Sequence, residues 1–174
     1  MRAFFREILG ILIAAIIIFF VLQISVQISV VEGHCMKPNL HDGQRLLISK
    51  ASYFFGEPQR GDIIIFYTSN NSKSPIFIKR VIGLPGETIE IKMGKVYING
   101  LSIDEAYIEE PPNYTFSQQE ILDNNYFVLG DNRNNSNDSH NGWTVPRRNI
   151  IGKAWLSIWP LDEWGSIPSY SFEE

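Results

Sequence analysis

An uncharged apolar run near the amino terminus constrains this chain more than any other feature. From Ile8 through Val31 the sequence ILGILIAAIIIFFVLQISVQISVV contains no charged residue. As an α-helix rising about 1.5 Å per residue, the run would be roughly 36 Å long, which is enough to cross a bilayer. Between residues 23 and 30, Gln and Ser alternate with Ile and Val. This alternation predicts that the helix gives way to an extended segment before Gly33.

The flanks of the run predict an orientation. Arg2 and Arg6 precede it and only Glu7 opposes them, so the positive-inside rule places the amino terminus in the cytoplasm. The competing interpretation is a cleaved signal peptide, whose apolar region is usually ~7–15 residues followed by a small-x-small site. Here the run is longer and no Ala-x-Ala follows it. We expect a cytoplasmic segment at 1–7, a single-pass plasma-membrane anchor at 8–31 and an extracytoplasmic domain at 32–174.

The outer part of the chain has the pattern of an antiparallel β domain. Short runs rich in Ile, Val, Phe, Tyr and Trp are separated by turn signals, and no amphipathic helix of convincing length is found. The runs are RLLIS, DIIIFY, IFIKRVIGL, TIEIKMGKVYING, NYFVLGD and KAWLSIWPL. TIEIKMGKVYING predicts a hairpin turning at Met93-Gly94, and the polar residues 104–125 predict a surface loop or flap. Residues 84–125 together form a candidate smaller hairpin and flap insertion.

Composition excludes one class of partner and leaves others open. The chain has 174 residues, is 44% hydrophobic and 20% charged, and is therefore long and apolar enough to fold around a core. The formal net charge is -4 and no Lys/Arg-rich run occurs, which argues against nucleic acid binding. Composition does not indicate an oligomeric state.

The only cysteine, Cys35, lies in the stretch GHCMKPNL. Gly33 frees the backbone just before the thiol, while Pro38 restricts Lys37 to an extended conformation. The stretch therefore presents Cys35 at a strand end with its backbone N–H available. Taken alone, a single cysteine is more often inert packing than a nucleophile, and it can form no internal disulfide.

A second segment, FIKRVIGLPGE, carries a lysine within an apolar run. Strand alternation places Lys79 and Arg80 on opposite faces, so one of them must point toward the core or a cleft. Burial disfavours the charged form of a lysine, which is how a lysine becomes a general base. The alternative is an edge-strand lysine whose ammonium group reaches water.

A third segment, LGDNRNNSNDSHNGW, is a dense loop of Asp, Asn and Ser after a strand. A calcium loop needs oxygen ligands at alternate positions and a closing Glu, which this segment lacks. We therefore predict no metal and no cofactor here.

The motifs GHCMKPNL, RGDIIIF, IKRVIGLPGE and GDNRNNSNDSHNGW follow a membrane span in the order seen in type I signal peptidases (leader peptidases). The resemblance covers nearly the whole chain and implies an antiparallel β-sheet or partial-barrel catalytic domain. In that family a serine is the nucleophile and a lysine is its general base. The matching positions are Cys35 and Lys79, so a cysteine stands where serine is expected. Asn39 likewise stands where the family has threonine.

The resemblance also implies roles for the surrounding residues. Ser136 matches a serine that orients the lysine, and the backbone N–H groups of Cys35 and Gly33 are candidate oxyanion donors. The positions that match a supporting polar network are Arg80, Asp131, Asp138 and His140, the last replacing an arginine. The histidine makes the charge of this network depend on pH and is a rival base for the thiol.

The implied substrates are exported preproteins, cut after a small-x-small pattern at the end of the signal peptide. Candidate pocket linings are Met36, Ile78 and Val81, and a strand edge can bind the extended substrate. A thiol is more acidic than a hydroxyl, so attack by Cys35 remains feasible. The alternative hypothesis is a weak or inactive homologue that binds signal peptides or a partner peptidase. A third hypothesis takes Cys35 as an introduced change in a serine enzyme.

Overall fold

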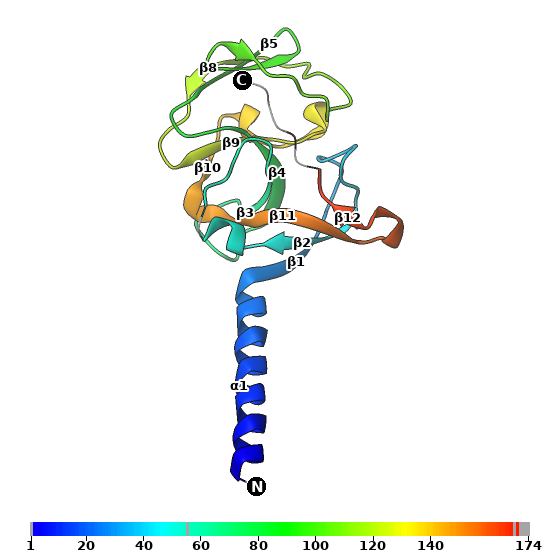
Figure 1. Ribbon diagram of the computed structural model, residues 1–174. Helices are drawn as coiled ribbons and strands as arrows, with labels where there is room; N and C mark the ends of the chain where they lie inside the picture. Colours follow the sequence, from blue (N-terminus) through cyan, green and yellow to red (C-terminus); the bar gives the residue numbers. More distant parts are fainter. Residues whose placement is uncertain (1, 55, 169, 171–174) are drawn as a thin grey trace.

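A long helix precedes the folded domain and stands clear of it. The computed structural model describes residues 2–54, 56–168 and 170. Helix α1 (Arg2–Ser25) projects from one end of the domain (Figure 1). Its Arg6–Ser25 portion is long and apolar enough to cross a membrane. The large apolar side chains described from Ile8 to Ile24 are exposed rather than packed on the domain, as expected if lipid surrounds them.

The uncharged run does not form one continuous helix. Its last part is strand β1 (Val26–Val30), which pairs in antiparallel register with the next strand of the chain. The predicted extended segment is therefore confirmed, and the helical part of the predicted 8–31 anchor ends at Ser25. The period-2 alternation of Gln and Ser with Ile and Val matches a strand, although Ile28 and Val30 are on its exposed side.

The larger of two sheets holds most of the predicted strands. Its order is β1-β2-β11-β3-β4-β9-β10, with β12 paired to β11, and every pair is antiparallel. The expected mainly antiparallel β fold is therefore confirmed. Their bounds are β2 (Arg45–Ser49), β3 (Ile63–Tyr67), β4 (Ile76–Gly83), β9 (Asn125–Leu129), β10 (Val145–Pro146), β11 (Ile150–Trp159) and β12 (Gly165–Ser166).

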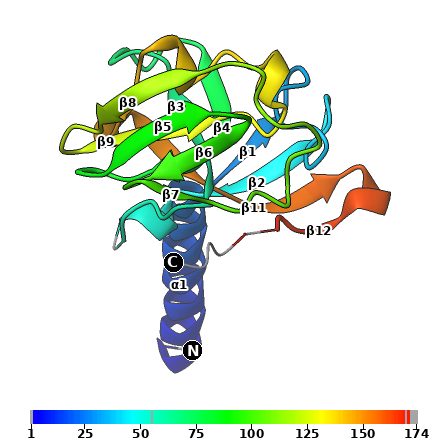
Figure 2. The ribbon, with the colours of Figure 1, turned by 90° about the horizontal axis from the view of Figure 1, so that it is seen from above.

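A smaller sheet lies at the end of the domain away from α1 (Figures 1 and 2). Its order is β7-β6-β5-β8, and its strands are β5 (Thr88–Lys92), β6 (Lys95–Ile98), β7 (Leu101–Ser102) and β8 (Phe116–Glu120). The hairpin at Met93-Gly94 is confirmed, since β5 pairs directly with β6. The predicted loop at 104–125 was wrong in part, because β8 within it pairs with β5.

Five short 3₁₀ turns complete the described elements. They are η1 (Ala51–Tyr53), η2 (Arg133–Asn135), η3 (Ser139–Asn141), η4 (Arg147–Asn149) and η5 (Leu161–Glu163). Two of them, η2 and η3, follow β9 in the Asn-rich segment. They bring that segment's polar side chains back toward the end of β9.

Alternation along β3 and β4 separates two cores. Ile65 and Ile78 pair across the strands and belong to a cluster that Cys35 joins. Phe66 and Phe77, the next pair along, belong to a different cluster with Trp143. The two clusters therefore lie on opposite faces of the sheet. A third cluster joins the smaller sheet to the end of β9.

Strand β4 is fully paired on one side only. All of Ile76 to Arg80 pairs with β3, whereas pairing with β9 begins at Arg80. Among the described residues, the segment 76–79 therefore has a free edge. This edge faces the chain that follows β1, and both lie beside a common cleft.

Candidate active site

Cys35 lies in a turn shortly after β1. Gly33 adopts a φ of 85°, a left-handed conformation that favours glycine over any residue with a Cβ atom. The carbonyl oxygen of Cys35 accepts a hydrogen bond from the N–H of Asn132 at 3.0 Å. The side-chain amide nitrogen of Asn132 donates to the backbone carbonyl of His34 at 3.2 Å. The loop after β9 thus fixes the backbone on which the thiol is carried.

Lys79, on the free-edge segment of β4, reaches the thiol. Its Nζ atom lies 3.0 Å from Sγ of Cys35 and 3.0 Å from the carbonyl oxygen of Ile78. Only 3% of the lysine is exposed, and no carboxylate pairs with it in the described part of the chain. The ring of Phe77 lies 5.2 Å from Nζ. The two residues that the sequence singled out as nucleophile and base are therefore hydrogen-bonded neighbours.

Ser136 and Gly130 border the same space as Cys35. A Cβ atom on Gly130 would lie 2.3 Å from Oγ of Ser136 and 2.5 Å from the carbonyl oxygen of Cys35. Position 130 therefore admits only glycine without a shift of the site. Within the described residues, the buried Oγ of Ser136 has no hydrogen-bond partner. A buried hydroxyl without a partner is costly, and this one adjoins the site.

The two candidate oxyanion donors differ. The backbone N–H of Gly33 donates to Oδ1 of Asp42 at 2.7 Å, so that carboxylate already occupies it. No hydrogen bond from the backbone N–H of Cys35 occurs among the described contacts. Cys35 is therefore the better-placed donor of the two.

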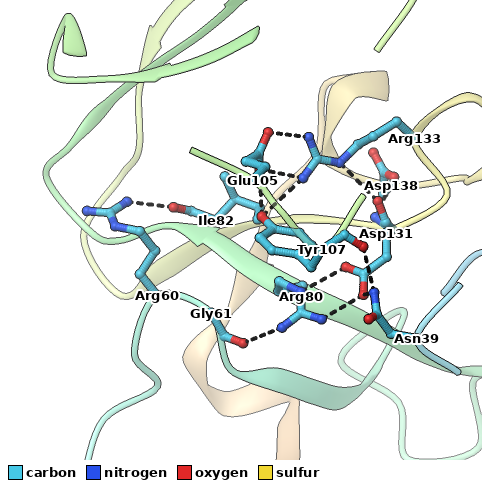
Figure 3. Close-up of polar contacts among 11 residues, drawn as sticks. Asn39, Arg60, Gly61, Arg80, Ile82, Glu105, Tyr107, Asp131, Arg133 and Asp138 are labelled. Carbon is cyan, nitrogen blue, oxygen red and sulfur yellow. Dashed lines mark hydrogen bonds and ion pairs between the residues drawn. The ribbon is translucent and has the colours of Figure 1, made fainter. Parts of the chain in front are cut away.

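A buried ion pair supports the far end of the site (Figure 3). Arg80 donates from Nε and Nη2 to the two carboxylate oxygens of Asp131, at 2.8 and 2.6 Å. Both side chains are completely buried. Arg80 also donates to the carbonyl of Gly61 at 2.9 Å. Lys79 and Arg80 are thus both buried and point in opposite ways, as strand alternation requires.

Asn39, which the motif resemblance matches to a threonine, joins this ion pair. Its amide nitrogen donates to Oδ2 of Asp131 and to the carbonyl of Tyr107, each at 2.8 Å (Figure 3). No local pattern predicts this contact, because 92 positions separate Asn39 from Asp131. The amide's two donor hydrogens satisfy two acceptors at once, whereas a hydroxyl donates one.

A second buried ion pair links the Asn-rich loop to the flap, and sequence reasoning missed it. Arg133 pairs with Glu105 and donates from Nε to the carbonyl of Gly130 at 3.1 Å (Figure 3). Tyr107 donates its hydroxyl to Glu105 at 2.6 Å. Burial, and then the negative charge of Glu105, raises the pKa of Tyr107, which keeps the hydroxyl a donor. The only available signal was Arg133 itself, an arginine inside a segment of small polar residues.

Asp138 holds the end of β9 and His140 together. Its Oδ2 accepts from the N–H of Gly130 at 2.9 Å, and its Oδ1 lies 2.6 Å from Nδ1 of His140. The imidazole stacks on the ring of Tyr114 from the flap, with centroids 4.2 Å apart. These contacts place His140 with Asp138 and Tyr114. Among the described contacts, His140 makes none with Cys35.

The cleft beside Cys35 has a volume of about 760 Å³. It lies between β1, with the segment up to Cys35, and the free edge of β4 at Ile76 to Lys79. Of the three pocket linings expected from the sequence, only Ile78 lines it. Met36 and Val81 are fully buried in separate core clusters, because the turn after Cys35 and the β9 pairing enclose them. Among the described residues, no group of three or more His, Cys, Asp or Glu side chains could hold a metal ion.

Comparison with known proteins agrees with these motifs. Residues 4–159 match the model of the family described as signal peptidase, peptidase S26. A signal peptidase I of Leptolyngbya laminosa is 45% identical over 149 residues, covering 80% of this chain and 73% of the relative. The probable signal peptidase I-1 of a Synechocystis strain is 40% identical over 176 residues, covering 97% of this chain and 90% of the relative.

A solved structure is similar as well. The crystal structure of a signal peptidase I from Enterococcus faecalis aligns with a TM-score of 0.50 and 34% identity, covering 56% of this chain and 97% of the solved one. The family match spans most of the chain, and the apolar helix α1 is consistent with the membrane anchor of such a protein. This chain therefore belongs to the signal peptidase I (peptidase S26) family.

Proposed function

We propose that this chain is a membrane-anchored endopeptidase that removes signal peptides from exported preproteins, cutting after a small-x-small site. Cys35 is the nucleophile and Lys79 is the general base. The observation that carries the proposal is the 3.0 Å approach of Lys79 Nζ to Cys35 Sγ in a cleft. The names of the related proteins support the substrate class.

The chemistry is acyl transfer through a thioester. Nζ of Lys79 takes the thiol proton as Sγ attacks the carbonyl carbon of the scissile peptide bond. The C–N bond then breaks, and Nζ returns the proton to the departing amine. A water molecule attacks the thioester, again losing a proton to Lys79. The C–S bond then breaks, the carboxylic acid product leaves, and Nζ returns the proton to Sγ.

Hydrogen-bond capacity supports a role for Ser136 in orienting the base. The contacts of Nζ with Sγ and with the Ile78 carbonyl use two of its three tetrahedral positions. The Oγ of Ser136 is buried beside the site and has no other partner in the described structure. In this proposal the Oγ of Ser136 pairs with the third position of Nζ. The backbone N–H of Cys35 serves as the oxyanion donor in this proposal.

The free edge of β4 is the proposed binding site for the substrate strand. Unpaired backbone groups on an edge add an extended peptide by β-augmentation. Ile76 and Ile78 lie along this edge, and β1 with the segment after it forms the opposite wall of the cleft. Side chains directed to the Cys35 side would meet Ile78 and Ile65, an apolar part of the cleft wall.

Exposed tryptophans support an arrangement close to the membrane. Trp155, Trp159 and Trp164 are 53%, 50% and 63% exposed. Strand β11, which carries the first two, lies at the end of the domain nearest α1 (Figure 1). Tryptophan favours the membrane–water interface. In the proposed orientation the amino terminus is cytoplasmic, and the domain faces outward against the plasma membrane.

Processing of a preprotein in detergent tests the proposal. We expect cleavage after the small-x-small site by the full chain, none by Cys35→Ala, and retained cleavage by Cys35→Ser. Unchanged cleavage by Cys35→Ala would overturn the assigned nucleophile. Binding of signal peptide without more than one product per protein molecule would instead identify a non-catalytic relative.

A further inference from the structure

A second cavity adjoins the catalytic cleft, and the mechanism does not use it. This side cavity has a volume of about 410 Å³ and is walled mainly by Phe66, Phe77, Trp143, Pro75, Thr68 and Asn137. Three of these residues, Pro75, Phe77 and Asn137, also line the catalytic cleft. The two spaces therefore meet along the same stretch of β4.

The side cavity lies on the face of the sheet opposite to Ile78 and Cys35. Phe77 pairs with Phe66 across β3 and β4, one position from the Ile65 and Ile78 pair. The ring centroid of Phe66 lies 6.3 Å from that of Phe77 and 6.2 Å from that of Trp143. Ile78 packs instead with the cluster that contains Cys35. Phe77 lines both spaces, so the catalytic cleft on the Ile78 face and the side cavity on the Phe66 face meet at this residue.

A peptide bound along β4 in extended form must send its side chains alternately to these two faces. If the two small residues of the cleavage site face Cys35 and Ile78, the residue between them faces Phe77 and the side cavity. A side chain at that position would have the side cavity, with a volume of about 410 Å³, available to it.

The chemistry of the cavity indicates which side chain fits. None of its described lining residues is charged. Three of its polar side chains already have partners: the Thr144 hydroxyl donates to Asn125, the Asn149 amide donates to the Tyr67 carbonyl, and the Asn137 oxygen accepts from Asn141. Aromatic rings that pack edge to face, as Phe66 and Phe77 do, favour another ring or a large apolar group.

We propose that the side cavity is a specificity subsite for the middle residue of the small-x-small sequence, selecting a large apolar or aromatic side chain there. This inference rests on the proposed function, because it assumes that the substrate lies along β4 with its scissile bond at Cys35.

The test uses three peptides that share Ala at both small positions and carry Ala, Glu or Phe between them. We expect kcat/KM for the Phe peptide to exceed that for the Ala peptide by about tenfold, the usual discrimination of an apolar pocket. The Glu peptide should fall below both. Trp143→Ala removes one wall and Thr68→Trp fills the exposed rim, and each should bring the Phe to Ala ratio close to one. Trp155→Ala, a tryptophan exposed on β11, is the matched control and should leave the ratio unchanged.

Binding of the same peptides to Cys35→Ala, measured by calorimetry, separates the two proposals. Tighter binding of the Phe peptide than of the Ala peptide supports the subsite even if no cleavage occurs, in which case the proposed function fails. Cleavage of all three peptides at equal rates, together with equal binding, would overturn the subsite and leave the proposed function intact. Thermal unfolding of each variant verifies that it is folded.

Discussion

The Nζ atom of Lys79 lies 3.0 Å from the Sγ atom of Cys35, although 44 positions separate the two residues. The turn after β1 and the free edge of β4 meet only in the folded chain. No charged partner competes for the buried amine among the described residues, so the thiol and the Ile78 carbonyl are its polar surroundings.

Lys79→Met should lower kcat for preprotein cleavage by about 10²–10⁴-fold, the usual contribution of a general base. His140→Gln should lower it by less than about tenfold, because His140 contacts Asp138 and Tyr114. Both rates are measured in detergent with one preprotein. A larger loss in His140→Gln than in Lys79→Met would make histidine the base.

Gly130→Ala should disable the site while leaving the fold in place. The new methyl group would lie 2.5 Å from the Cys35 carbonyl, so the backbone that carries the thiol must shift. Displacements of about 1 Å at a reacting group cost on the order of 100-fold in rate. Gly10→Ala in α1, where an added Cβ atom would meet nothing within 4 Å apart from its chain neighbours and the nearby helix backbone, is the matched control and should leave activity unchanged. Full activity of Gly130→Ala would show that the approach of Ser136 and Cys35 is not required.

Ser136→Ala should lower kcat by at least about tenfold without lowering stability. Its Oγ has no partner in the described structure, so its removal relieves an unpaired buried hydroxyl rather than breaking a contact. Activity and the urea midpoint are measured on the same samples. Reduced stability with unchanged kcat would assign Ser136 a structural role instead of lysine orientation.

Asp131→Ala should destabilise the domain by about 3–5 kcal/mol, because it leaves the fully buried Arg80 without its carboxylate. The control variant Glu90→Gln, which removes one partner of a partly exposed ion pair with Lys92, should cost less than about 1 kcal/mol. Urea unfolding of both variants checks this. Equal effects would mean that the buried pair contributes no more than the partly exposed pair.

Alternation of apolar residues was sufficient to predict the central strands, since β2, β3, β4 and β9 each bury one or both faces. Strand β8 was not predicted, because Phe116–Glu120 is mostly polar and exposed and is held in place by pairing with β5. Strand β1 was hidden in the tail of the apolar run, where the sequence indicated only an extended segment.

In the candidate site, too, some residues were predicted from the sequence and others were not. The order of the motifs was sufficient to predict that Cys35 and Lys79 lie together, because the resemblance to a family implies their roles. The separation of the two residues along the chain does not indicate this proximity. Contacts made by side chains from distant loops, such as Asn39 with Asp131 and Arg133 with Glu105, depend on how the flap packs. Local sequence has no periodicity that reports such contacts.

The most direct test of the Cys35 and Lys79 pair is the rate of iodoacetamide alkylation at pH 7, followed by intact mass. Because Cys35 is the only cysteine, a single mass increment reports its modification. A neighbouring amine can accept the thiol proton, and the ammonium group that results stabilises the negative charge of the thiolate. Both effects favour the reactive thiolate. Lys79→Met should therefore slow alkylation by about tenfold or more, and the exposed-site control Lys95→Met should not change it. Equal alkylation rates in the original chain and in Lys79→Met would contradict the pairing of Lys79 with Cys35.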